Sequence, residues 1–144
     1  MAFVAPTADF EKRIRESFAK QTFMVGIGAT ISSVTPGEVV LDLPFRGDLT
    51  QQNDFLHAGV VTALADVACG YAATTLMPVG SDVLSVEFKI NLIAPGLGER
   101  FSAVGRVLRA GRTLTTCAAD VWAIHRGETT QIAAMLATMM QVTR

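Results

Sequence analysis

The sequence predicts an α+β fold in which one antiparallel sheet curls around a long, apolar central helix. Between Asp54 and Asp82 the chain has a single formally charged side chain, Asp66, set among small and apolar residues. On both sides of this segment, apolar and polar residues alternate with the period of two that half-buried strands show. The economical arrangement of such elements places the helix against one face of one sheet.

The composition limits the class of protein. The chain has 144 residues, of which 50% are hydrophobic, and a formal net charge of −1. This length suits one domain, residues 1–144, with a substantial core. Disorder is not indicated, because half the residues are apolar, and a nucleic-acid partner is not expected without a basic face. The first residues lack the basic and apolar regions of a secretory signal, so we expect a cytoplasmic protein.

A short amphipathic helix is predicted over residues 8–20. Asp9 provides a start signal, and Phe10, Ile14 and Phe18 then recur at a spacing of four residues. This spacing places the three side chains on one face of a helix, where they can pack against the rest of the protein.

A β-hairpin is predicted next. Apolar and smaller residues alternate from Met24 onward, which indicates extended structure. Residues 35–37, Thr-Pro-Gly, form a turn signal, and residues 39–43 resume the extended pattern.

The central helix is predicted over residues 58–77 and is stopped by Pro78, which lacks a backbone donor. Its length is close to the roughly 20 residues that span a bilayer. Asp66 near its middle, and a composition rich in Ala, Gly and Thr, disfavour insertion into lipid. We therefore expect no membrane partner, and a helix that is buried on most sides by soluble protein.

Four strands in a meander are predicted to follow. In the first, which starts at Val83, the alternation predicts one buried face. Its apolar row consists of Leu84, Val86, Phe88, Ile90 and Leu92. The other strands are predicted over residues 101–110, 113–124 and 130–142, separated by turns at 110–112 and 126–128.

The two cysteines, Cys69 and Cys117, lie in apolar segments without His or Cys neighbours at metal-ligand spacing. They are interpreted as reduced core thiols. We expect neither a metal nor a cofactor.

Several residues at the start of the central helix and beyond it could form a catalytic site. They are Gln51, His57, Ala58, Gly59, Asp66 and Ser85. Their arrangement resembles the hotdog-fold acyl-CoA thioesterases of the phenylacetate-degradation, PaaI-like type, and the likeness covers about residues 24–142. That family has an Asn six residues before a His-Gly-Gly, an Asp in the helix and often a Ser in the following strand. Gln51 stands where Asn is usual, and Ala58 replaces the first glycine.

The chemistry of these residues fits thioester hydrolysis. Unpaired N–H groups at a helix start, here those of Ala58 and Gly59, can stabilise a developing oxyanion. Asp66 lies roughly 13 Å further along the helix, too far to act on the same carbon atom. We therefore expect each site to combine two chains across a two-fold interface, as the resemblance to paired hotdogs also implies.

The predicted function is hydrolysis of aryl- or medium-chain acyl-CoA, with Asp66 as general base or nucleophile. Gln51 would hold the water or the thioester, His57 would orient the loop, and Ser85 would position water. A homodimer or a tetramer of two dimers is expected, because the apolar helix needs more cover than one sheet provides.

Three alternatives stay open at this stage. His57 and Asp66 could serve a hotdog dehydratase or hydratase, because such an enzyme needs a His and a carboxylate that converge on one carbon. A non-catalytic acyl-CoA-binding module would tolerate the loss of Asp66. Asp66 could also be a buried structural carboxylate that is hydrogen-bonded to nearby donors.

Overall fold

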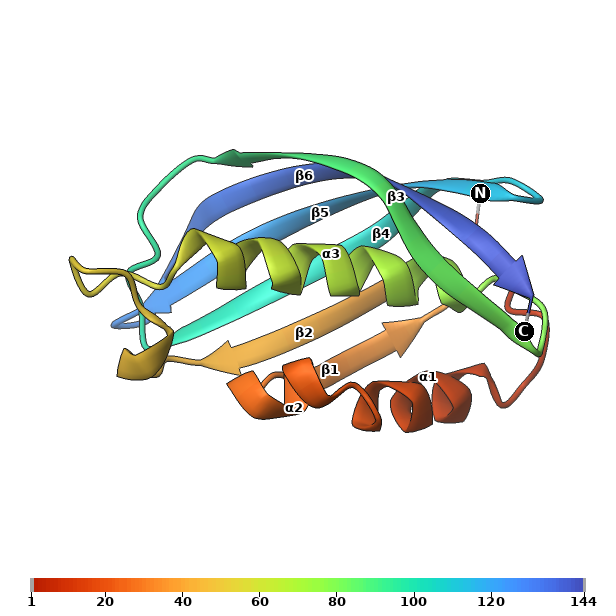
Figure 1. The fold of residues 1–144 in the computed structure, drawn as a ribbon, viewed down its shortest axis with the longest axis horizontal. Coiled ribbons are helices and arrows are strands. Elements are labelled where there is room, and N and C mark those ends of the chain that lie inside the picture. The colour runs from red at the N-terminus through yellow and green to blue at the C-terminus, as the bar shows by residue number, and fades with distance from the viewer. Residues whose placement is uncertain (1, 144) are drawn as a thin grey trace.

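In the computed structural model, which describes residues 2–143, six strands form one antiparallel sheet that curves around helix α3 (Figure 1). The helices are α1 (Phe10–Ala19), α2 (Thr22–Ile27) and α3 (Ala58–Thr74), with a 3₁₀ turn η1 at Gly47–Leu49. The strands are β1 (Thr30–Thr35), β2 (Glu38–Pro44), β3 (Ser81–Leu92), β4 (Arg100–Ala110), β5 (Leu114–His125) and β6 (Glu128–Thr143). The predicted α+β hotdog architecture is confirmed.

The N-terminal elements agree with the sequence prediction except at α2. Helix α1 lies within the predicted range, with Ile14 and Phe18 buried, and the hairpin of β1 and β2 is present. Extended structure from Met24 was a wrong prediction, because α2 occupies this segment. Met24 and Ile27 are buried, and their spacing of three residues also fits one face of a helix. Gly28, at φ 84°, ends this helix in the left-handed conformation that glycine adopts readily.

The order of strands in the sheet is β1-β2-β4-β5-β6-β3. The predicted meander is therefore right for β4, β5 and β6 and wrong for β3, which lies at the far edge beside β6. Helix α3 crosses the inner face of the sheet, and the chain continues from its end into β3 at that edge (Figure 1). Alternation along a strand indicates which side chains share a face, but it does not identify the neighbouring strand.

Helix α3 packs unusually close to the sheet at Gly105. A Cβ atom at this position of β4 would lie 2.3 Å from the carbonyl carbon of Ala68. Ala65, Ala68 and Ala72 on α3 are fully buried, so small residues on both elements allow the two backbones to approach. The helix ends at Thr74, three residues before its predicted end, and a turn follows.

Strand β3 departs from the predicted alternation. A bulge between Ser85 and Glu87 shifts its register against β6, so that Ser85 pairs with Met139 and Phe88 pairs with Ala137. Partners two residues apart on β6 share a face, and Ser85 therefore faces the same side as Phe88. The prediction of one buried apolar row was wrong. Along this edge strand Leu84, Val86 and Phe88 are 54%, 51% and 43% exposed.

Two further expectations agree with the structure. Cys69 and Cys117 are buried free thiols, as predicted. Within residues 2–143, no helix is both long and apolar enough to cross a bilayer.

Candidate active site

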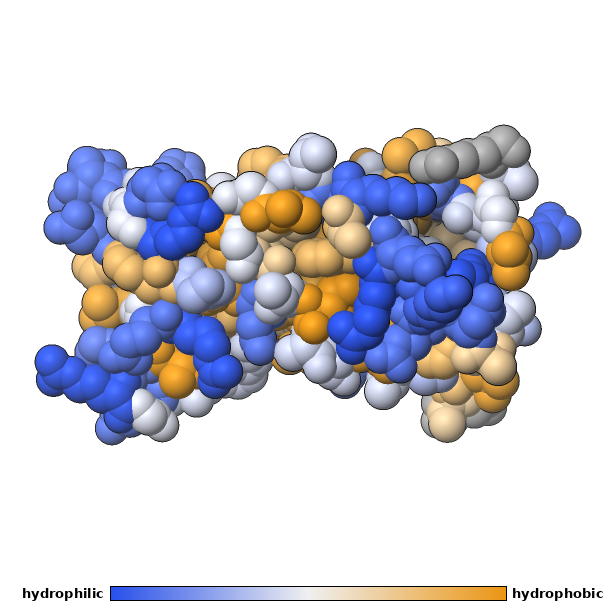
Figure 2. All heavy atoms as spheres, turned by 90° about the horizontal axis from the view of Figure 1, so that it is seen from below, coloured by the Kyte–Doolittle hydropathy of each residue, from blue (hydrophilic) through white to orange (hydrophobic). Residues whose placement is uncertain are grey.

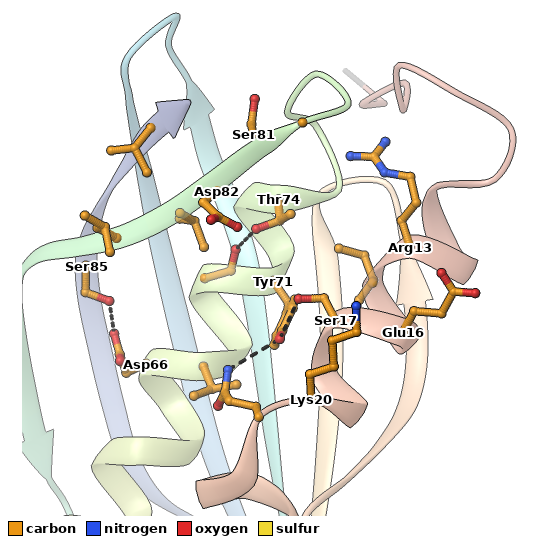
Figure 3. Close-up of a pocket in the computed structure, with 18 residues that line it drawn as sticks. Arg13, Glu16, Ser17, Lys20, Asp66, Tyr71, Thr74, Ser81, Asp82 and Ser85 are labelled. Atoms are coloured by element: carbon orange, nitrogen blue, oxygen red, sulfur yellow. Dashed lines mark hydrogen bonds between the residues drawn. The ribbon is translucent and has the colours of Figure 1, made fainter. Parts of the chain in front are cut away.

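Asp66 and Ser85 meet at the wall of a groove between α1, α3 and the first half of β3 (Figure 3). The Ser85 hydroxyl donates a hydrogen bond to Oδ1 of Asp66 at 2.6 Å. The groove has a volume of about 860 Å³. The two residues that the sequence places 19 positions apart are thus in direct contact beside a space large enough for a ligand.

Local structure explains this contact. Asp66 is half-buried on α3. Asp66, Gly70 and Thr74 follow one another at a spacing of four residues, which places them on one face of the helix, and all three line the groove. The β3 bulge turns Ser85 toward the helix side of the sheet. Without the bulge, strict alternation from Phe88 would place Ser85 on the opposite face.

A tight loop precedes α3 and contains Gln51. Its side-chain Oε1 accepts a hydrogen bond from the Asn53 N–H, and its own N–H donates to the Phe55 carbonyl oxygen at 2.9 Å. Asp54 adopts a positive φ of 65°, which Asp tolerates better than most residues. The Gln51 amide therefore organises the turn while lying next to the start of the helix.

His57 caps α3. Its Nδ1 accepts a hydrogen bond from the Gly59 N–H at 2.8 Å, and its own backbone N–H donates to the Leu49 carbonyl oxygen at 2.9 Å. Of the two predicted oxyanion donors, the Gly59 N–H is thus engaged within the loop. The Ala58 N–H, the first of the helix, has no acceptor among residues 2–143, and Ala58 is an exposed residue.

Four of the six predicted site residues line two separate hollows of the chain, and His57 and Gly59 line neither. Asp66 and Ser85 line the large groove, whereas Gln51 and Ala58 line a smaller hollow of about 380 Å³ at the other end of α3. The smaller hollow has mainly apolar walls, including Leu92 of β3. One chain therefore brings together Asp66 with Ser85, and Gln51 with Ala58, but not these two pairs with each other.

The buried Cys69 thiol does not add a nucleophile to the site. Hydrogen bonding with Cys117, together with burial, raises the pKa of the Cys69 thiol well above its usual range. A thiol in this state stays protonated, and only the thiolate is a strong nucleophile. The part of the chain that the structure describes also contains no group of three or more His, Cys, Asp or Glu side chains able to bind a metal ion.

Sequence reasoning missed a polar cluster on the far wall of the groove. Tyr71 of α3 lies 3.2 Å, oxygen to oxygen, from the Ser17 hydroxyl of α1 and accepts a hydrogen bond of 3.4 Å from the Gln21 amide (Figure 3). Tyr71 is the single tyrosine of the chain, placed within its most apolar helix. That isolated phenol was a signal in the sequence, although its partners on α1 were not visible there.

Comparisons with known proteins agree on one family and one fold. A model of the thioesterase superfamily matches residues 53–130. A protein of Saccharolobus solfataricus, provisionally named an esterase, is 30% identical over 72% of this chain and 74% of its own length. The medium/long-chain acyl-CoA thioesterase YigI of Escherichia coli is 30% identical over 59% of this chain and 61% of its own length.

Solved structures extend this likeness. A thioesterase family protein from Silicibacter pomeroyi has 45% sequence identity and a TM-score of 0.92, covering 94% of this chain and 99% of its own. The PaaI protein of the E. coli phenylacetic acid degradation operon has a TM-score of 0.83 at 16% identity, covering 93% and 94% of the two chains. At that identity the second likeness concerns the fold alone.

Proposed function

Since this chain belongs to the thioesterase superfamily, we propose that it hydrolyses the thioester bond of an acyl-CoA, releasing a free acid and CoA. Asp66 is the catalytic carboxylate of this proposal. The observation that carries the assignment is the hydrogen bond from Ser85 to Oδ1 of Asp66 at the groove wall. An ionised carboxylate on an otherwise apolar helix needs such a partner, and its second oxygen stays available to water or substrate.

Two chemical routes fit this arrangement. As a general base, Asp66 takes a proton from water, whose oxygen then attacks the thioester carbon, and the tetrahedral intermediate expels the CoA thiolate. As a nucleophile, a carboxylate oxygen attacks the same carbon and expels the thiolate, leaving a mixed anhydride that water hydrolyses. In both routes Ser85 orients the carboxylate, and the negative charge that develops on the thioester oxygen needs a donor.

The Ala58 N–H is that donor in our proposal. It is the free N–H at the positive end of α3, where a helix stabilises negative charge. His57 supports it indirectly, because its Nδ1 accepts from the Gly59 N–H and so shapes the first turn. This engagement favours an orienting role for His57 over proton transfer, and hence hydrolysis over dehydration. Gln51, beside Ala58 in the smaller hollow, would contact the thioester or the attacking water.

The complete site requires two chains in this proposal. Asp66 and Ala58 are eight residues apart on one helix and line different hollows. In the proposed assembly, Asp66 of one chain therefore faces Ala58 of a second copy. The edge strand β3 supports this assembly, because it exposes Leu84, Val86 and Phe88 and has an unpaired side within the described residues. A two-fold dimer through this edge would cover exposed apolar side chains of β3 and build two equivalent sites.

A thiol-release assay over a panel of aryl- and alkyl-acyl-CoAs tests the proposed function. We expect catalysed release of CoA from at least one member of the panel and its loss in Asp66→Asn. A hydration assay on enoyl-CoA run beside it separates hydrolysis from dehydratase chemistry. Hydration without release of thiol would contradict the proposal.

A further inference from the structure

The Ser85 hydroxyl has a second neighbour besides Asp66. Its Oγ lies 3.5 Å from Sδ of Met139, a thioether sulfur that can act as a weak acceptor. Met139 is the residue of β6 that pairs with Ser85 of β3. On the proposed function, which this inference presupposes, we propose that Met139 is a positioning residue that holds the Ser85 hydroxyl beside Asp66 through the reaction.

The groove side of Ser85 does not hold its hydroxyl in one orientation. Ser85 is exposed on an edge strand and lines the groove. Arg13, Glu16 and Lys20 of α1 line the same groove, and the outer surface of that helix is mostly hydrophilic (Figure 2). Water therefore competes for the hydroxyl. Because a serine side chain has three staggered rotamers, a fixed contact on the protein side is needed to favour one of them.

Met139 supplies such a contact from the core. Its side chain is fully buried on the inner face of the sheet and does not line the groove. On β6 it lies between its two paired residues, Ser85 of β3 and the buried Thr115 of β5. A side chain in a close-packed interior keeps its place. The sulfur is thus a fixed point of contact for Ser85 that water does not reach.

The unequal strengths of the two acceptors suit a role during the reaction. The Ser85 hydroxyl has one hydrogen, which the ionised Asp66 carboxylate, at 2.6 Å, attracts more strongly than a thioether sulfur does. In the proposed mechanism Asp66 gains a proton or an acyl group, and either change removes its negative charge and weakens it as an acceptor. The hydroxyl can then turn toward Sδ of Met139 instead of toward water. It stays beside Asp66 and bonds the carboxylate again when the charge returns.

A double-mutant cycle on the kcat of thioester hydrolysis tests this role. Met139→Leu removes the sulfur and keeps a side chain of similar volume. In the parent it should lower kcat by about 2- to 5-fold, the factor for one weak hydrogen bond, and leave KM unchanged because Met139 does not line the groove. In a Ser85→Ala background, Met139→Leu should have no further effect on the residual kcat. Thermal melts verify that each variant is folded.

Met135→Leu is the matched control. Met135 is also a methionine on the inner face of β6, and it is 3% exposed. It pairs with Ile90 and Ala119, neither of which has a hydroxyl group. This variant should therefore leave kcat unchanged.

Three results would overturn the inference while leaving acyl-CoA hydrolysis intact. One is an unchanged kcat in Met139→Leu. Another is the same loss of kcat with and without the Ser85 hydroxyl, since Met139 would then not act through Ser85. The third is an equal loss in Met135→Leu, because any change of the core would then suffice. Absence of hydrolysis by the parent with every acyl-CoA would instead overturn the proposed function, and this inference with it.

Discussion

The Ser85 hydroxyl donates to Asp66 Oδ1 over 2.6 Å, across the gap between the edge strand and the central helix. This contact engages one oxygen of the carboxylate, and the other oxygen is the one that acts on water or substrate in the proposed mechanism. Because a hydrogen bond to a charged group contributes about 1.5–3 kcal/mol, the orientation of Asp66 depends measurably on one hydroxyl.

Ser85→Ala should therefore lower kcat/KM for thioester hydrolysis by about 10- to 100-fold without unfolding the protein. Ser85 is exposed on an edge strand, so its removal leaves no cavity. Ser85→Thr keeps the hydroxyl and should recover most of the activity. Steady-state kinetics with a thiol probe checks both variants, and an unchanged kcat/KM in Ser85→Ala would exclude the positioning role.

Ala58 offers a test of the oxyanion donor, because the proposed group is a backbone N–H. Ala58→Gly keeps the donor and should preserve most hydrolysis. Ala58→Pro removes it and should lower kcat by about 10²- to 10³-fold. Ala58 is the first residue of α3, a position where proline is well tolerated, so the variant should fold. Circular dichroism verifies the fold, and a folded proline variant with normal turnover would remove Ala58 from the site.

Assembly can be tested at strand β3. The double variant Val86→Lys and Phe88→Lys places charges on the exposed apolar edge and should yield a monomer that has lost hydrolysis. Val25→Lys, at a residue of α2 that is 57% exposed, is the matched control and should remain dimeric. Light scattering at micromolar concentration gives the mass. A parent protein that is a stable monomer with full activity would refute the two-chain site.

Gly105 tests the packing of α3 on the sheet. Gly105→Ala should lower the free energy of unfolding by about 1–3 kcal/mol, because the new Cβ would overlap the Ala68 backbone. Gly70→Ala is the matched control, since its Cβ would only touch Val83 Cγ1 at 3.7 Å and alanine favours the helix. Urea denaturation monitored by circular dichroism measures both changes. Equal stability of the two variants would contradict the close approach.

The sequence predicted the elements of this fold better than their connections. The lone Asp66 in an apolar run and the alternation after Val83 were sufficient to predict a central helix and a surrounding sheet. The family resemblance, inferred from the segment at His57 and from Asp66, is confirmed by the match to the thioesterase superfamily. The place of β3 at the far edge was not predictable, because the alternation of side chains contains no information on strand order.

The candidate site was predicted in part for the same reason. Asp66 was selected as a lone charge in an apolar helix and Ser85 from the family resemblance. Their contact depends on a bulge in β3, which the alternation of apolar and polar residues does not reveal. The engagement of the Gly59 N–H by His57 depends on a side-chain rotamer, which spacing along the chain does not determine. Tyr71 was overlooked because its partners Ser17 and Gln21 lie 54 and 50 residues earlier.

Asp66→Asn provides the most direct test of the catalytic account. The Asn side-chain oxygen can still accept from Ser85, so the variant should fold at least as stably as the parent and keep its affinity for acyl-CoA. Its turnover should fall by about 10²- to 10⁴-fold, the range for loss of a general base. Single-turnover release of thiol, measured beside thermal melts of the same sample, distinguishes the alternatives. Near-normal turnover in a destabilised Asp66→Asn protein would contradict the account and assign Asp66 a structural role.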